Sequence, residues 1–306
     1  MWSRALVPAL CAIALAGCGL GAGSTPDAPV SLTVTRDFGT KAIVELPDAN
    51  VSGEDTVMRV LRRNAKVSTR YGGKFVQAID GVSGGRRGGR AVGWLVYVNG
   101  ILADQGASAI DVYGGDRIWL DHHDGGETPD SKAVVGSYPE PFVHGTGGKR
   151  LPVRVECVDP NAAACSAVAD KLLALGVPIG RSNISRSPAD ETLRVLVGPW
   201  SKLRGRDAES DAIDAGPKAS GVFARFDRSG KRLFVLDARG ETRHALGPGS
   251  GLVAATRANE RRPVWYVTGT DDEGVASAAR ALDEGALSNR FALAISDDLP
   301  VAVPAD

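Results

Sequence analysis

The sequence has no excess of charge of either sign, because 36 lysine and arginine residues balance 36 aspartate and glutamate residues. This balance creates no overall field that would attract nucleic acid, and we expect no nucleic-acid partner. Beyond its first twenty residues the chain also lacks a long apolar run, whereas a membrane-spanning helix needs roughly 20 apolar residues. The length of 306 residues suggests two domains rather than one.

The motifs of the common enzyme classes are absent as well. The sequence has no G-x-S-x-G elbow, no H-E-x-x-H helix and no dinucleotide-binding fingerprint, and residues 145–150 lack the spacing of a phosphate-binding loop. His122 and His123 are adjacent, so on an extended segment they point to opposite faces and cannot easily share a metal ion. We therefore expect no enzyme, catalytic residue, metal ion or cofactor, and interpret residues 121–124 as a solvated strand end.

The first residues carry the clearest signal. Arg4 precedes about a dozen mostly apolar residues, which is the pattern of an export signal over residues 1–17. The segment "LAGC", residues 15–18, resembles the lipobox of bacterial lipoproteins. The resemblance implies that Cys18 is lipidated and anchors the protein to the extracytoplasmic face of the cell membrane. A secreted protein cut near Gly23 is the alternative.

Cysteine is scarce, and its use agrees with export. Cys11 lies in the signal and Cys18 is assigned to the lipid, so only Cys157 and Cys165 remain for the folded protein. In an oxidising compartment these two can form a local disulfide, which loop-closure entropy makes worth about 2.5 kcal/mol. A metal or redox pair is the alternative, although its cysteines would normally lie closer together.

Composition divides the mature chain. Residues 18–29 are rich in Gly, Ser and Pro and predict a lipidated flexible tether, and residues 125–150 predict a second linker for the same reason. Between them, alternating strands at residues 30–37 and 41–47 precede a helix whose first turn carries Glu54 and Asp55. Three further strands are predicted before residue 124.

Residues 30–124 carry a resemblance in this first domain. The helix, "YGGKFVQAIDGV", "WLVYVNG" and "GGDRIWL" resemble the C-terminal domain of transcobalamin and intrinsic factor, which recurs as a domain of unknown function in bacterial surface proteins. The resemblance implies a β-grasp-like sheet with one helix across it. In the vitamin carriers this domain covers one face of bound cobalamin, opposite a barrel of paired helices that this sequence does not contain.

Residues 151–298 alternate between strand and helix patterns. The strand "LPVRVEC" leads into a helix that we expect Asn161 to cap and Gly176 to end, and further strands and helices follow up to "RFALAIS". This alternation predicts an α/β domain with a mixed sheet, followed by a tail at residues 299–306. The predicted fold class is therefore α+β.

The segment "WLVYVNG", residues 94–100, ends in Asn-Gly and predicts a tight type I′ hairpin. Alternation places Trp94 and Tyr97 on opposite faces of this strand, and both faces are apolar. Only one face can lie under the helix. The other is available to the second domain, to another protein, or to a ligand bound by Trp94 or Tyr97 together with Tyr71 from the neighbouring loop.

We therefore expect a membrane-anchored lipoprotein that binds or presents a small extracellular ligand. The resemblance makes a corrinoid a candidate ligand and a transporter component a candidate partner. A structural or adaptor lipoprotein that binds a protein or a wall polymer is the alternative. The basic loop "GGRRGGR", residues 84–90, is interpreted as a flexible hairpin loop, with anionic lipid or wall polymer as its alternative contact.

Overall fold

The computed structural model of the protein describes residues 28–49, 51, 55–124, 130–184, 191–257 and 262–305. The predicted signal peptide, the lipidation of Cys18 and nearly all of the predicted tether lie outside the described residues. No helix in the described part of the chain has the length and apolar character needed to cross a bilayer.

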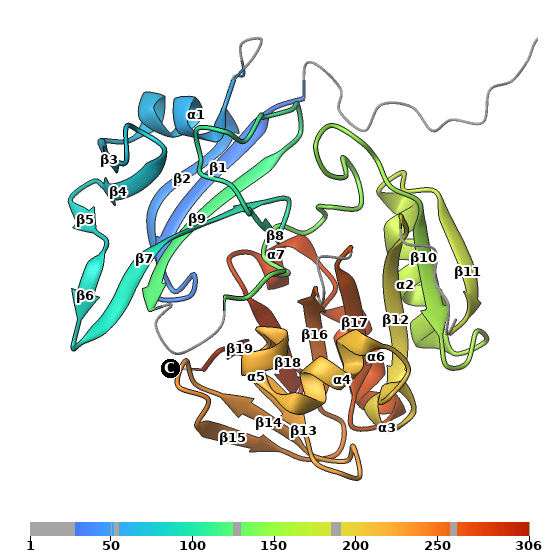
Figure 1. The fold of residues 1–306 in the computed structure, drawn as a ribbon. Coiled ribbons are helices and arrows are strands. Elements are labelled where there is room, and N and C mark those ends of the chain that lie inside the picture. Colours follow the sequence, from blue (N-terminus) through green and yellow to red (C-terminus); the bar gives the residue numbers. More distant parts are fainter. Residues whose placement is uncertain are drawn as a thin grey trace, which may run out of the picture.

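The N-terminal half is built on a six-stranded sheet with the order β2-β1-β9-β7-β6, and β8 pairs with β7 (Figure 1). Its strands are β1 (Val30–Arg36), β2 (Lys41–Ala49), β6 (Gly85–Arg87), β7 (Arg90–Val98), β8 (Ile101–Leu102) and β9 (Arg117–Asp124). β1 and β9 are parallel, and the other neighbours are antiparallel. A smaller antiparallel sheet contains β3 (Val67–Arg70), β4 (Phe75–Ile79) and β5 (Val82–Ser83).

Helix α1 (Val57–Asn64) covers one face of the six-stranded sheet, where its apolar side chains meet those of β1, β7 and β9. The helix begins later than the sequence predicts. Thr56 is the N-cap and accepts a hydrogen bond from the Arg59 N–H, so Asp55 lies before the first turn. Asp55 is buried and forms a salt bridge with Arg63, whereas Glu54 lies outside the described residues.

The C-terminal half is built on a seven-stranded sheet with the order β11-β10-β12-β17-β16-β18-β19. Its first four strands are parallel and its last three are joined antiparallel, so both large sheets are mixed and the fold is α+β. The strands are β10 (Val153–Cys157), β11 (Ile179–Asn183), β12 (Leu193–Pro199), β16 (Gly251–Thr256), β17 (Val264–Gly269), β18 (Ala292–Ser296) and β19 (Leu299–Val303).

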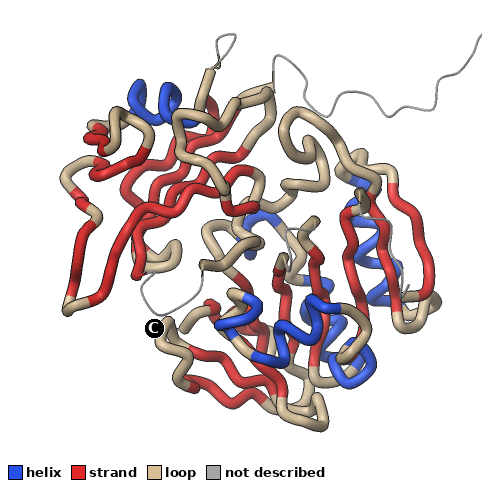
Figure 2. The backbone as a smooth tube through the Cα atoms, in the orientation of Figure 1, coloured by secondary structure: helices blue, strands red, loops and turns tan. Residues whose placement is uncertain are grey.

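Both faces of this sheet are covered (Figure 2). One face packs against α2 (Ala163–Ala174), α6 (Asp272–Arg280) and the nearby α7 (Glu284–Leu287). The other packs against α3 (Trp200–Leu203), α4 (Ala208–Ala215), α5 (Pro217–Ser220) and a three-stranded sheet. That sheet contains β13 (Ala224–Phe226), β14 (Leu233–Leu236) and β15 (Thr242–Leu246). Along β12 and along β17, successive side chains therefore point alternately into one core and into the other.

Two local predictions for this half differ from the structure. The N-cap position of helix α2 is Ala162, so no side chain caps the helix. Asn161 lies one residue earlier, where its backbone N–H donates to Asp159 Oδ1 at 2.9 Å. The predicted tail at residues 299–306 contains β19, which pairs with β18.

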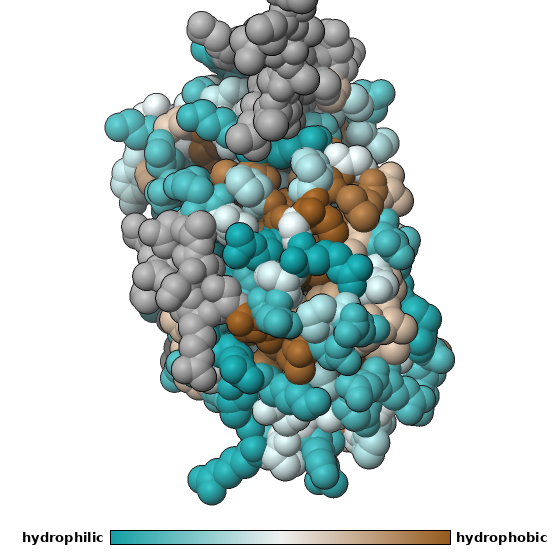
Figure 3. All heavy atoms as spheres, turned by 90° about the vertical axis from the view of Figure 1, so that its right-hand side faces the viewer, coloured by the Kyte–Doolittle hydropathy of each residue, from teal (hydrophilic) through white to brown (hydrophobic). Residues whose placement is uncertain are grey.

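The outer face near α2 and β11 is largely hydrophilic with separate hydrophobic areas (Figure 3).

The predicted linker is also different from a surface loop where the structure describes it. Residues 130–150 have little regular structure, yet much of this segment is buried. Val134 packs with the N-terminal half, whereas Val135, Tyr138 and Phe142 belong to the core beneath the seven-stranded sheet. This segment is called the connecting segment below. It joins the two halves by packing against both.

Candidate functional site

The two faces of β7 have different neighbours. The face that carries Trp94 packs with the core under α1, and the face that carries Tyr97 points to the C-terminal half. Tyr71 lies on neither face; it is 75% exposed at the β3–β4 turn and contacts Phe75. The structure therefore does not bring Tyr71, Trp94 and Tyr97 together as one ligand surface.

Tyr97 is fully buried at the contact between the two halves. Its ring centroid lies 5.6 Å from that of Trp119 and 5.8 Å from that of Phe291, which immediately precedes β18. Phe38, from the β1–β2 turn, also packs against Phe291. The second apolar face of the strand is thus occupied by the C-terminal half, so Tyr97 is unavailable to a ligand in this arrangement.

The Asn99-Gly100 turn fixes the end of the same hairpin. Both residues have positive φ, +54° and +76°, as a type I′ turn requires. Asn99 is fully buried and donates from Nδ2 to Asp116 Oδ1 at 2.7 Å and to the Gly145 carbonyl at 2.8 Å. At Gly100, an added Cβ would lie 2.7 Å from the Val134 carbonyl oxygen. The turn therefore docks against the connecting segment.

A cleft of about 380 Å³ opens beside this turn, between the two halves of the molecule. We call it the hairpin cleft. The N-terminal half contributes the apolar side chains Val98, Ile101 and Leu102, with Ala109 and Ile110 from the following loop. The opposite side includes Thr146, Gly147, Arg257, Arg262 and Pro263. Clefts with apolar walls and a few convergent polar groups are the usual binding sites for small molecules.

The polar groups of the hairpin cleft include one perturbed carboxyl. Asp116 is 2% exposed, and burial raises its pKa from 3.8 to about 6, against the lowering effect of hydrogen bonds from the Tyr113 N–H and Asn99. Across the cleft, Arg262 donates to Thr146 Oγ1 at 3.2 Å and pairs with Glu191 at 3.0 Å. The cleft thus offers a buried acid and a guanidinium group on opposite walls.

Residues 121–124 are not the solvated strand end that the sequence predicts. Asp121 is fully buried and accepts hydrogen bonds from Thr35 Oγ1 and from the backbone N–H groups of Phe38 and Gly39. His123, 5% exposed, places Nδ1 2.6 Å from the same carboxylate. His122 points to the other face and lies against Trp94. Burial lowers the pKa of His122.

His123 lines a second cleft of about 600 Å³, here called the arginine cleft. Its Nδ1 faces Asp121, and its ring packs against Phe38 and Phe291. Ion pairs occupy much of the rim: Arg87 with Asp37, Arg90 with Asp124 and Arg243 with Asp237. In the described part of the chain, no group of three or more His, Cys, Asp or Glu side chains could hold a metal ion.

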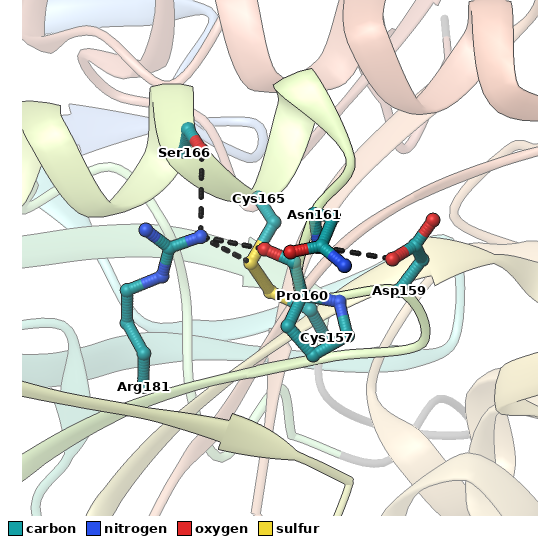
Figure 4. Close-up of a disulfide and its surroundings, with 7 residues drawn as sticks. All are labelled: Cys157, Asp159, Pro160, Asn161, Cys165, Ser166 and Arg181. Carbon is teal, nitrogen blue, oxygen red and sulfur yellow. Dashed lines mark hydrogen bonds between the residues drawn. A yellow bond between two sulfur atoms is a disulfide. The ribbon is translucent and has the colours of Figure 1, made fainter.

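Cys157 and Cys165 form a disulfide that joins the end of β10 to the first turn of α2 (Figure 4). The guanidinium of Arg181, on the neighbouring β11, donates to the Pro160 carbonyl at 2.7 Å and lies 3.5 Å from Cys165 Sγ. The disulfide therefore closes the β10–α2 loop and links the strand to the helix.

Comparisons with known proteins match part of the N-terminal half. Residues 54–124, from just before α1 to the end of β9, match the family described as "Domain of unknown function (DUF4430)". A solved structure from Ruminococcus gnavus, described as a "putative metal binding protein", is similar at 17% identity with a TM-score of 0.26; the match covers 32% of this chain and 99% of that chain. No match to a curated protein was found.

Proposed function

We propose that this chain is a bacterial lipoprotein, anchored through Cys18 outside the cytoplasmic membrane, that binds a small extracellular ligand in the hairpin cleft. It acts as a binding protein rather than an enzyme, and it delivers its ligand to a partner such as a transporter component. The observation that carries the proposal is the cleft itself, which has apolar walls from one half, polar groups from both and the raised pKa of Asp116.

The sheet order supports the further proposal of a β-grasp-like domain over residues 30–124. The parallel pair β1 and β9 lies at the centre, with antiparallel neighbours on each side and α1 across one face. The resemblance to the transcobalamin C-terminal domain makes a corrinoid one member of the ligand panel. We also propose residues 151–298 as the second domain, because they contain most of the two cores around the seven-stranded sheet.

The anchor is tested separately from the ligand. Replacing Cys18 with Ser should release the protein from membranes or leave its signal uncleaved, because the thiol is the only site for the proposed lipid. A Cys18→Ser protein that is processed normally and still fractionates with membranes in high salt would contradict lipidation at this position.

The ligand is tested by a thermal-shift screen of the chain without residues 1–23, which retains every described residue. The panel contains corrinoids, other vitamins, nucleotides and wall fragments. A ligand at a hundred times its dissociation constant should add about 2.7 kcal/mol to the free energy of unfolding. Ala109 is exposed in the hairpin cleft, so Ala109→Trp should fill it and abolish the shift. Ala219, exposed on α5, supplies the control Ala219→Trp.

The arginine cleft provides a second candidate site within the same screen. His123, whose Nδ1 lies 2.6 Å from Asp121, lines this cleft together with several arginine residues, which favours an anionic ligand. Arg239 lines the arginine cleft, so a shift that survives Ala109→Trp and disappears in Arg239→Gln would assign the ligand to that cleft. A panel without any shift would contradict the proposal of a small ligand and favour the adaptor alternative.

A further inference from the structure

The β3–β4 turn presents the two most exposed aromatic side chains of the described residues. Tyr71 is 75% exposed and Phe75 is 53% exposed, and their rings contact edge to face at 5.8 Å. Tyr71 also has a φ of +53°, a left-handed conformation that a tyrosine rarely adopts. Two adjacent exposed aromatic rings outside the core form a small apolar patch on the surface.

The same surface is strongly basic. Between residues 55 and 80 the chain has six basic residues, all exposed, and two acidic residues. Asp55 is paired with Arg63, and the Asp80 carboxylate accepts the Lys66 backbone N–H. Arg62, on α1, donates to Thr69 Oγ1 on β3 at 3.4 Å, which holds its guanidinium against the hairpin. This segment therefore places positive charge beside the two rings.

This surface lies at the end of the molecule where the described part of the chain begins. The N-terminal end of β1 and the α1/β3–β4 region lie at the same end of the molecule (Figure 1). Backbone hydrogen bonds place Ala28 near the start of α1, because the loop at residues 110–115 pairs with Ala28, Asp55 and Val57. Ala28 lies ten positions after Cys18, and ten residues span at most about 35 Å when extended. A lipid on Cys18 would keep this end near the bilayer.

We propose that the basic aromatic patch, formed by Tyr71, Phe75, Arg62, Arg70 and Lys74, contacts the anionic lipid surface of the membrane to which the protein is anchored. The inference rests on the proposed lipid anchor for its geometry. Aromatic rings prefer the headgroup region of a bilayer, and basic side chains are attracted to anionic lipids. Together they would orient the body and leave the clefts between the two halves accessible from outside.

The test measures vesicle binding of the chain without residues 1–23, so the patch is assayed without the lipid. Vesicles contain phosphatidylcholine alone or with phosphatidylglycerol. The variant Arg62→Gln/Arg70→Gln/Lys74→Gln removes the charges, and Tyr71→Ser/Phe75→Ser removes the rings. Matched controls use exposed residues of the C-terminal half, namely Lys202→Gln/Lys218→Gln/Arg232→Gln and Leu173→Ser/Leu299→Ser.

The unmodified body should bind the anionic vesicles more tightly than the neutral ones, and high salt should weaken this binding. Each basic residue near the surface contributes about fivefold, so the triple charge variant should lose about a hundredfold in affinity. The aromatic variant should also lose affinity, while both controls stay within about twofold of the parent.

Three results would overturn the proposal: equal binding to both vesicle types, an equal loss in the control variants, or binding to an anionic wall polymer but to neither vesicle. These results are independent of the cysteine and cleft tests, because no residue of the patch lines the hairpin cleft.

Discussion

Phe291 is the side chain whose removal should most directly separate the two halves of the molecule. It is 3% exposed, and its ring lies 5.1 Å from that of Phe38, 5.2 Å from that of Trp119 and 5.3 Å from that of His123, all in the N-terminal half. Removing a buried Phe side chain typically costs about 3 to 5 kcal/mol. For Phe291→Ala, this loss falls on the contact between the halves.

Phe226 provides a matched control. It is 5% exposed and stacks on Trp200 at 5.0 Å, wholly inside the C-terminal half. Both Ala variants should lower the unfolding free energy in urea by a similar amount. Hydrogen exchange should differ between them, because Phe291→Ala removes one packing partner of β7 and β9 on the face that meets the C-terminal half, so their amides should lose protection first. Phe226→Ala should instead weaken β13 and β14.

Two results would refute this account of the interface. One is a loss of less than about 1 kcal/mol for Phe291→Ala, since that would mean the site is poorly packed. The other is an unchanged order of amide exchange, with β7 and β9 as protected as in the parent chain. In either case the halves would be held together by contacts other than this aromatic cluster.

Three further predictions concern stability. Tyr97→Phe should leave the unfolding free energy unchanged or raise it by roughly 1 kcal/mol, because the buried Tyr97 hydroxyl has no described partner. Tyr266→Phe is the comparison. It removes a 2.7 Å hydrogen bond to Asp207 and should lower the unfolding free energy by about 1 kcal/mol. Replacing both Cys157 and Cys165 with Ser should cost about 2.5 kcal/mol in chemical denaturation, and no loss would show that the disulfide is dispensable. The folded-state pKa of Asp116 is raised to about 6, so its folded form holds a proton more tightly than its unfolded form. The unfolding free energy of the parent relative to Asp116→Asn should therefore fall by roughly 3 kcal/mol as pH rises from about 4 to about 6, and stay level above that; a flat difference would contradict the raised pKa.

Most elements that the sequence predicted have a strong period of apolar residues. β1 and β10 alternate apolar and polar residues, and β12 and β17 contain short apolar runs. One missed strand, β16, is a fully buried apolar run that was overlooked, whereas three other missed strands lack such a period. β15 is mostly exposed, β11 contains the polar run "GRSN", and β19 contains Pro300 on an edge strand.

Tertiary packing explains the other differences between the predictions from sequence and the structure. The connecting segment is rich in Gly and Pro, so its composition predicts a loop. Its aromatic side chains nevertheless pack into the core beneath the seven-stranded sheet, a contact that the local sequence does not indicate. Asp121 follows the apolar run of β9 and looks exposed in the sequence, but backbone N–H groups from the β1–β2 turn satisfy it in the interior.

The candidate site was only partly predictable. The Asn-Gly signal identified the turn, and alternation correctly placed Trp94 and Tyr97 on opposite faces. The hairpin cleft, however, combines that turn with residues near positions 146 and 262. Only the topology brings these segments together, so no local pattern marks Asp116 or Arg262 as neighbours of one cleft.

The most direct test of the central claim is hydrogen exchange of the chain without residues 1–23, with and without a saturating ligand from the panel. If the ligand lies in the hairpin cleft, protection should rise in residues 98–113 of one half and in residues 146–147 and 262–269 of the other. Protection confined to one half, or to the arginine cleft around His123, would contradict a ligand held in the hairpin cleft between the two halves.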